Sequence, residues 1–198
     1  NYNEEYWQKK TFAPSSFLYY VAFNRKVNHL LHHNLFFDTD FEAHAKEIYD
    51  TKELPKQPLF YANFSSKTDD SLCEEGKEVG FFLIPVAVDL EDNEEIHEKY
   101  FQLILDRIKK CTGEDLSDAI VFKKSFGVKD FKERYHSCRG NAYGLANTLL
   151  QTSVLRPTIK NKKLKNFFYT GQLTVPGPGV PPALISGKVV TDYILKNN

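Results

Sequence analysis

A turn rich in proline and glycine, at residues 171–182, carries the residue types best suited to holding a ligand. Glycine lacks a Cβ and adopts positive φ, so a ligand can closely approach the backbone there. The prolines fix φ and lower the entropy of the open loop. We therefore predict a cofactor site in this turn. Its residues are Gly171, Gln172, Pro176, Gly177, Gly179, Val180, Pro181, Pro182 and Ala183.

An amphipathic helix is predicted after the turn, from about Pro181 to Leu195. Proline suits the first helical turn, where the N–H that it lacks would have no partner. Ala183, Leu184 and Ile185 are then expected to carry N–H donors without intrahelical partners. Such donors and the helix dipole favour an anion or a developing negative charge. A rigid strand-to-helix connection without a ligand explains the composition equally well.

The first 127 residues alternate between β-rich runs and helical spacing, which predicts an α+β domain. We expect a mixed or antiparallel sheet with helices on one face. The run 81–84 is continuously apolar and is expected in a central strand. The predicted strands are 17–23, 32–37, 59–64, 78–88 and 119–126. Two helices are predicted in this part. The first is capped by Thr39, and its buried face comprises Phe41, Ala45, Ile48 and Tyr49. The second is capped by Asp92 and ends at Gly113, and its buried face comprises Ile96, Tyr100, Leu103, Leu105, Ile108 and Cys111.

The composition changes after Gly127. A short helix is predicted at 128–136, and a basic surface loop at 158–165. Residues 166–170 are expected to form a buried strand, with no obvious partner strand in the first 127 residues. This last strand therefore indicates a second sheet.

The composition and the residue spacing argue against nucleic acid, a membrane-spanning segment and a metal site. The 26 basic and 26 acidic residues give zero net charge, which argues against nucleic acid as the main partner. No apolar run is long enough to span a membrane. The three cysteines match neither a metal site nor a disulfide framework, and His29, His32 and His33 have no further ligand at metal spacing. We expect no metal, and one of the adjacent histidines should face inward.

Residues 169–182, Tyr-Thr-Gly-Gln-Leu-Thr-Val-Pro-Gly-Pro-Gly-Val-Pro-Pro, resemble the carboxy-terminal signature of bacterial phytoene desaturases, which are FAD-dependent carotenoid desaturases. The likeness extends over nearly the whole chain. Family members are much longer, so the chain is similar to their carboxy-terminal portion, and a first residue other than Met agrees with a fragment. Their Gly-x-Gly-x-x-Gly fingerprint has no counterpart here. Other matching segments are 12–15, 32–37, 59–61, 83–86 and 140–151.

The resemblance implies two parts: a substrate-binding domain at 1–127, and a segment at 128–198 that completes the FAD-binding domain. The latter would supply the terminal strand and helix of a split Rossmann-like fold, and the proline-glycine turn would approach the flavin at N1–C2=O. Gln172 stands where related flavoproteins have an acid. With the main pyrophosphate-binding part absent, the isolated chain is expected to bind FAD weakly or not at all. Phe126, Asn141 and Tyr143 are expected at the substrate mouth.

The implied reaction is desaturation of phytoene or a related carotenoid by hydride transfer to flavin. A hydrophobic polyene offers no polar handle along its middle, so it must be bound by apolar burial, which the aromatic runs would supply. The enzyme is expected in the cytoplasm with a peripheral membrane contact, and no catalytic acid or base stands out. The alternatives are another flavin-dependent carotenoid enzyme, such as an oxygenase or isomerase, or a non-catalytic module that binds an apolar ligand or a membrane.

Overall fold

The computed structural model describes residues 2–197 and divides into two compact units. Unit 2 is Ser15–Gly140, and unit 1 joins the chain before Ser15 to the chain after Gly140. The structural division therefore falls after helix α4 (Val128–Tyr135), whereas the sequence places a boundary before that helix.

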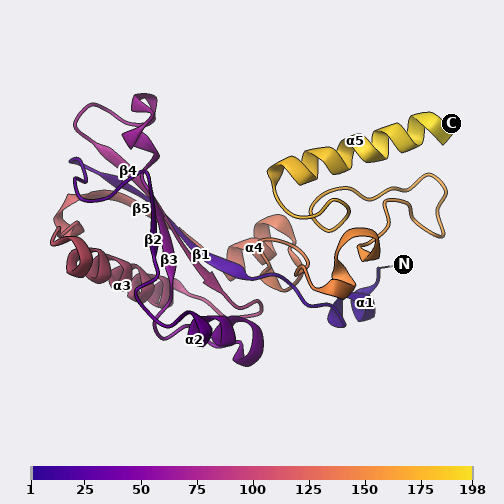
Figure 1. The fold of residues 1–198 in the computed structure, drawn as a ribbon, viewed down its shortest axis with the longest axis horizontal. Helices are drawn as coiled ribbons and strands as arrows, with labels where there is room; N and C mark the ends of the chain where they lie inside the picture. The colour runs from indigo at the N-terminus through magenta and orange to yellow at the C-terminus, as the bar shows by residue number, and fades with distance from the viewer. Residues whose placement is uncertain (1, 198) are drawn as a thin grey trace. The chain divides into compact units, whose positions relative to one another are not determined.

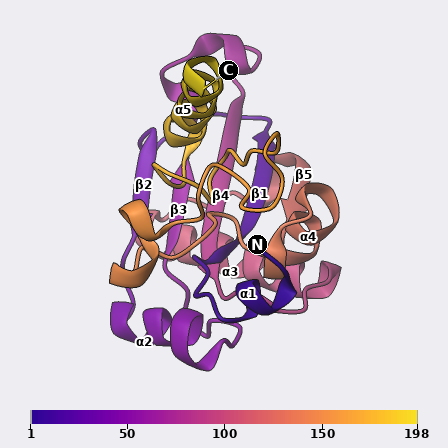
Figure 2. The same cartoon turned by 90° about the vertical axis from the view of Figure 1, so that its right-hand side faces the viewer.

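Unit 2 is built on a five-stranded sheet in the order β2-β3-β4-β1-β5, which Figure 2 shows from left to right. All pairings are antiparallel. Each of the five predicted strands is present, and the apolar run 81–84 lies in the middle strand as predicted. The strands are β1 (Ser15–Phe23), β2 (His33–Phe36), β3 (Phe60–Asn63), β4 (Glu78–Val86) and β5 (Ile120–Phe126).

The core lies between one face of this sheet and helix α3 (Glu94–Thr112), which Figure 1 shows alongside the strands. Phe82 of β4 is fully buried, and its ring centroid lies 6.2 Å from that of Phe101 in α3. Tyr19 of β1 is also fully buried and lies 5.2 Å from Phe101. Apolar burial between α3 and the sheet therefore dominates the stability of unit 2.

Helix α3 begins one residue later than predicted, because Asn93 rather than Asp92 is its cap. The Oδ1 atom of Asn93 accepts from the N–H of Ile96 at 2.9 Å. The predicted stop is confirmed, since Gly113 adopts a left-handed φ of 77°. The predicted face was partly wrong, because Ile96 and Leu103 are only half-buried and Cys111 is exposed. Its buried residues are His97, Tyr100, Phe101, Ile104, Leu105 and Ile108.

Helix α2 (Phe41–Lys46) and the π-helical turn Glu47–Thr51 bury a different face from the predicted one. Phe41 and Tyr49 are 60% and 49% exposed. His44 is buried instead, with its Nε2 atom 3.0 Å from the carbonyl of Pro85 and its Nδ1 atom accepting from the N–H of Leu59 at 3.1 Å. Asp40, not Thr39, caps this helix. A hydrogen-bonding imidazole, rather than an apolar stripe, fastens α2 to the sheet.

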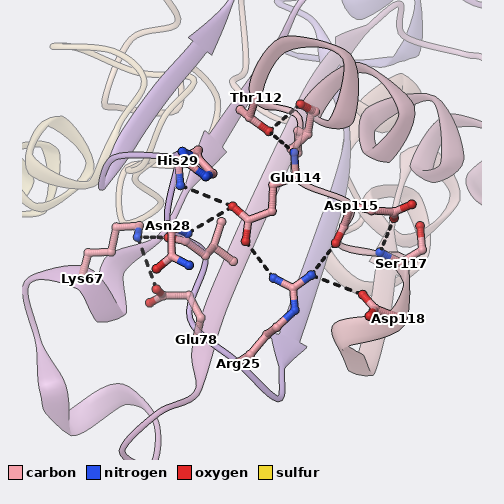
Figure 3. A network of polar contacts seen from close by, with 12 residues as sticks. Arg25, Asn28, His29, Lys67, Glu78, Thr112, Glu114, Asp115, Ser117 and Asp118 are labelled. Atoms are coloured by element: carbon pink, nitrogen blue, oxygen red, sulfur yellow. Dashed lines mark hydrogen bonds and ion pairs between the residues drawn. The ribbon is translucent and has the colours of Figure 1, made fainter.

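Polar contacts connect the loops at one end of unit 2 (Figure 3). The guanidinium of Arg25 pairs with Glu114 at 2.7 Å and with Asp118 at 3.2 Å. Beside it, Lys67 lies 3.4 Å from the buried carboxylate of Glu78. The pairs of Arg25 fix the β1–β2 connection against the loop that follows α3, and the pair of Lys67 joins the 3₁₀ turn Ser65–Lys67 to β4, so we assign both a structural role.

Unit 1 contains a short helix α1 (Glu4–Gln8), two 3₁₀ turns (Leu149–Gln151 and Ser153–Leu155) and the long helix α5 (Val180–Asn197). Figure 1 draws α5 in yellow. The predicted terminal helix is confirmed. Residues 166–170, however, form no strand. Their one bridge among the described residues joins Phe168 to Lys160, and a strand requires a neighbour along its length.

Candidate functional site

The proline-glycine turn of unit 1 forms a corner that precedes α5. Gly171 has a φ of 102°, and a Cβ at this position would meet open space. Its N–H donates to the hydroxyl of Ser186, 2.7 Å away, and the same hydroxyl lies 2.7 Å from Oγ1 of Thr170. Ser186 is fully buried. One serine on the first turns of α5 therefore fixes the helix against the entry to the corner.

The start of α5 presents fewer backbone donors than the sequence suggested. The helix begins at Val180, one residue earlier than expected, and the N–H of Ala183 donates to the carbonyl of Gly179 at 3.0 Å. Leu184 and Ile185 lie far enough into the helix for i→i−4 bonding. The prediction of three unpaired donors was therefore wrong. Pro181 and Pro182 have no N–H, so in the first three residues of α5 the N–H of Val180 is the one donor, and it has no acceptor among residues 2–197.

A buried arginine lies beneath the corner. Arg156 is 4% exposed, and its Nη2 atom donates to Oδ1 of Asn147 at 2.5 Å. Its Nη1 atom donates to the carbonyl of Gln172 at 3.4 Å. A Cβ at Gly177, whose φ is 131°, would lie 3.3 Å from Cζ of Arg156. Glycine at 177 thus allows the backbone of the corner to lie directly on the guanidinium.

The charge of Arg156 has no carboxylate partner within its unit. No Asp or Glu occurs between residues 141 and 191, and within the described part of the chain no ion pair includes Arg156. Burial lowers the pKa of its guanidinium from the usual value, although an arginine side chain remains charged in proteins. This residue could not be predicted from the sequence, because one arginine in a loop has no distinguishing pattern.

The corner fits a flavin on this charge and geometry. A buried cation without a counter-ion, one open helix N–H and an unobstructed glycine together favour an electron-rich group. The N1–C2=O edge of a flavin gathers negative charge on reduction and meets that description. Gln172 is half-buried at the same place, and its main-chain carbonyl accepts from Arg156.

A second candidate surface is the sheet face of unit 2 that turns away from α3. We call it the open face. Cross-strand register places Leu18 beside Leu83, and Tyr20 beside Phe81, on this face. Its residues are half-buried or exposed, in contrast to the buried face. The open face comprises Leu18, Tyr20, Leu35, Tyr61, Phe81, Leu83, Phe122 and Phe126, with His33, Asn63 and Lys124 at its margins.

Hydrogen-bonding side chains border the open face at β2 and β3. Nδ1 of His33 lies 2.6 Å from the hydroxyl of Tyr61, which also accepts from Nδ2 of Asn63 at 3.0 Å. Nδ1 of the neighbouring His32 lies 2.7 Å from Oγ1 of Thr68. The expectation that one histidine faces the core was wrong, because His33 is exposed and His32 is half-exposed at the sheet edge.

The three predicted substrate residues fall in two units. Phe126 lies on the open face, 4.9 Å from the ring of Phe131 in α4, so α4 covers the β5 end of this face. Asn141 belongs to unit 1 and is buried, and its Oδ1 accepts from the N–H of Gly144 at 2.6 Å. Tyr143, in the same unit, is 41% exposed. Their role in substrate binding stays a prediction.

Residues 2–197 contain neither a candidate membrane span nor a candidate metal site. No helix in this range combines the length and the apolar character needed to cross a bilayer. No three His, Cys, Asp or Glu side chains in this range come together in a way that could hold a metal ion.

Known proteins resemble the chain from end to end. It is 41% identical over 196 residues to the carotenoid 3,4-desaturase of Haloarcula japonica, covering 99% of the chain and 40% of that relative. It is 30% identical over 195 residues to the zeta-carotene-forming phytoene desaturase of Myxococcus xanthus, covering 95% and 37%. A 4,4'-diapophytoene desaturase of Staphylococcus haemolyticus is 30% identical over 205 residues, covering 100% and 40%.

No protein-family model matches the chain. The chain spans about 40% of the length of the curated relatives given above. Those relatives carry the names of carotenoid and phytoene desaturases, and they match both units. The chain therefore belongs to the carotenoid desaturase family, as its carboxy-terminal signature predicts.

Proposed function

We propose that the whole protein is an FAD-dependent carotenoid desaturase. It would remove two hydrogens from a saturated C–C bond that is flanked by double bonds. One hydrogen leaves with its electron pair as a hydride, the other leaves as a proton, and the remaining electron pair forms the new double bond. FAD, when bound, would supply the hydride acceptor. The observation that carries the proposal is the 41% identity to a carotenoid 3,4-desaturase along 99% of the chain.

Unit 2 supports this function through its open face. A polyene has no hydrogen-bonding group along its middle, so affinity must come from apolar surface removed from water, at about 25 cal/mol per Å². Leu18, Phe81 and Leu83 lie side by side on the neighbouring strands β1 and β4 and offer such a surface. The antiparallel sheet is rigid, so it can hold an extended chain straight and orient the bond that reacts. We assign unit 2 as the substrate domain.

Unit 1 supports the cofactor assignment through the corner. The N–H of Val180 can donate to a carbonyl oxygen of the flavin, and Gly171 leaves room for close approach. The buried guanidinium of Arg156 would favour the extra negative charge of a reduced flavin, because a charge acts strongly where water is excluded. We assign residues 166–170 and α5 to the carboxy-terminal end of a split FAD-binding domain.

The test uses the whole protein, purified and mixed with a carotene in micelles. The purified protein is expected to be yellow from bound flavin, and conversion should shift the carotenoid absorbance to longer wavelength. Leu83→Asp puts a charge in the middle of the open face and should lower turnover more than tenfold, since a bare carboxylate beside a polyene is strongly unfavourable. Flavin absorbance should stay unchanged in this variant.

Leu72→Asp is the matched control. Leu72 is 47% exposed in the 3₁₀ turn Asp70–Leu72, away from the sheet strands, so the same change should leave turnover intact. A colourless protein would reject the flavoenzyme assignment. Equal turnover of the two variants would reject the open face as the polyene surface.

A further inference from the structure

The open face carries a hydrogen-bonded phenol among its apolar side chains. Tyr61 of β3 lies on this face in cross-strand register with Leu35 on one side and Leu83 on the other. Its ring is half-buried, and the ring centroid lies 6.4 Å from that of Phe81. The hydroxyl of Tyr61 lies 2.6 Å from Nδ1 of His33 on β2, the strand at the edge of the sheet (Figure 2). A phenol on the apolar surface is thus joined to an imidazole at the sheet edge.

Asn63 fixes the direction of the hydrogen bond between these two side chains. Its Nδ2 atom donates to the hydroxyl oxygen of Tyr61 at 3.0 Å and lies 3.3 Å from Nδ1 of His33. An amide nitrogen only donates, so this network assigns a lone pair to Nδ1 of His33 and the ring proton to Nε2. The hydroxyl oxygen of Tyr61 already accepts from Asn63, and its own proton is therefore directed at Nδ1. The phenol is the donor and the imidazole is the acceptor.

His33 connects the phenol to water. Its side chain is exposed, and its ring centroid lies 4.1 Å from that of His32, whose Nδ1 lies 2.7 Å from Oγ1 of Thr68. Among residues 2–197 the one ion pair that includes a histidine is that of His97 with Asp92, so no carboxylate holds a proton on His33. Imidazole is the side chain that accepts and releases protons near neutral pH. The pair is thus arranged to carry a proton from the open face to solvent.

The reaction proposed above requires such a route. Each new double bond releases one proton, and an apolar surface covered by a polyene cannot solvate that charge. A hydrogen next to a carbocation is strongly acidic, so a neutral phenol oxygen backed by an imidazole suffices as its acceptor. A base must also lie within reach of the proton that it takes. Tyr61 meets this condition because it lies within the open face, beside Leu83.

We propose that Tyr61 and His33 accept the proton that desaturation releases, an inference that rests on the proposed function. After the hydride has left one carbon, the C–H bond of the neighbouring carbon breaks, and its electron pair forms the new double bond. The proton passes to the hydroxyl oxygen of Tyr61 while the hydroxyl proton passes to Nδ1 of His33. The imidazolium then gives one proton to water. Tyr61 is the catalytic residue, and His33 is a positioning residue that acts through it.

The experiment follows a single turnover of the whole protein, mixed with a carotene in micelles without oxygen. The rate constant is that at which the longer-wavelength product appears. Tyr61→Phe keeps the ring, removes the hydroxyl and should lower this rate about a hundredfold, as expected for loss of a general acid–base group. His33→Gln should lower it by a similar factor. The double variant should be no slower than either single variant, because the two side chains act as a unit.

The matched controls change the same residue types elsewhere in unit 2. Tyr49→Phe removes the hydroxyl of an exposed tyrosine in the turn after α2, and His29→Gln replaces an exposed histidine of the β1–β2 connection. Both residues lie outside the open face, so both variants should react like wild type. Affinity for the carotene, measured by quenching of flavin fluorescence, and thermal unfolding should be unchanged in these controls, in Tyr61→Phe and in His33→Gln.

Two further readouts separate proton transfer from a structural role. The wild-type rate should fall in acid, where a protonated imidazole no longer accepts a proton, and His33→Gln should lose this dependence. Free imidazole should restore part of the rate in His33→Gly, because the site is open to solvent. It should not restore the rate in Tyr61→Phe.

Wild-type rates in both Tyr61→Phe and His33→Gln would overturn the inference and leave the proposed reaction intact. Weaker carotene binding at an unchanged rate would also overturn it, because the two side chains would then hold the substrate and not take its proton. A loss of flavin or of thermal stability that matches the loss of rate would overturn it in favour of a structural role. A wild-type protein that binds flavin but converts no carotene would reject the proposed reaction, and the inference with it.

Discussion

The two long helices of the chain are nearly equal in length but stabilised in different ways. α3 has 19 residues, buries six of them, and is capped by Asn93 and Gly113. α5 has 18 residues and buries only Ser186, while Leu184 and Leu195 are 73% and 75% exposed. Since helix stability in proteins comes mainly from packing of one face, α3 belongs to a completed core. In the described residues 2–197, α5 is held by a few polar contacts. We therefore expect α5 to be less stable than α3.

The same contrast holds for the units that contain these helices. Of the 26 buried hydrophobic residues in the range 2–197, all but Phe12 and Leu145 lie in unit 2. Unit 1 instead relies on hydrogen bonds such as those of Arg156 and Ser186. A segment with little apolar burial opens at low free energy cost. For the 198-residue chain by itself, we therefore expect unit 2 to unfold cooperatively and unit 1 to loosen first.

The largest expected effect is on the core of unit 2. Phe82→Ala removes a fully buried ring between Phe64 and Phe101 and should lower the free energy of unfolding by about 3–5 kcal/mol, since it leaves a cavity. Leu184→Ala on α5 of the same 198-residue chain is the control and should change stability by about 0.5 kcal/mol or less. Urea titration followed by circular dichroism measures both.

Similar losses of stability from these two substitutions would contradict the claim that unit 2 has a packed core and unit 1 does not. A large loss from Leu184→Ala would mean that α5 is packed in solution as α3 is. A small loss from Phe82→Ala would mean that the sheet does not depend on its buried face.

The sequence predicted the elements that carry their own pattern. The strands of unit 2 combine β-rich composition with turns at their ends, and α3 has strong helical spacing followed by glycine. Residues 166–170 have the composition of a strand but not its neighbour, and pairing is not encoded in one segment. In α2 the spacing of Phe41 and Tyr49 predicted the wrong face, because the tertiary contact of His44 outweighed apolar spacing.

The candidate site could be predicted in part, for a similar reason. The corner stands out because proline and glycine determine backbone conformation locally. Arg156 acquires its role only from folding, which buries it under Gly177 without a carboxylate. The donors expected at Ala183 to Ile185 were lost because α5 begins at Val180 and uses Gly179 as an acceptor. One residue in a helix start changed the set of available N–H groups.

An intermediate effect, on flavin retention, is expected from substitution of Arg156, the buried arginine of unit 1. Arg156→Met in the whole protein should weaken flavin retention at least tenfold, because it removes the charge under the corner and two hydrogen bonds worth about 1.5–3 kcal/mol each. Arg156→Lys keeps the charge and should retain most of the flavin. Flavin absorbance after dialysis measures retention, and the midpoint potential should fall only in the methionine variant. Equal losses in both variants would leave Arg156 a purely structural residue.

The smallest expected effect is a pH dependence of the stability of unit 2, because His44 lies in that unit and not in unit 1. Burial is the main cause that lowers the pKa of His44 from its ordinary 6.5, and the hydrogen bond to Pro85 opposes it only partly. Its Nδ1 accepts from the N–H of Leu59, so a proton on Nδ1 would face another proton. Glu47 raises and Arg107 lowers the same pKa.

The folded state therefore binds a proton on His44 less readily than the unfolded state. Its contribution to stability is complete above pH 6.5 and declines as the pH falls from 6.5 through the folded-state pKa, with a slope of at most about 1.4 kcal/mol per pH unit. The free energy of unfolding of unit 2, measured by urea titration between about pH 7.5 and about pH 5, should follow this slope. His44→Gln should remove it, because an amide does not titrate in this range. An unchanged slope in His44→Gln would mean that another group causes the pH dependence and that the protonation of His44 does not affect the packing of α2.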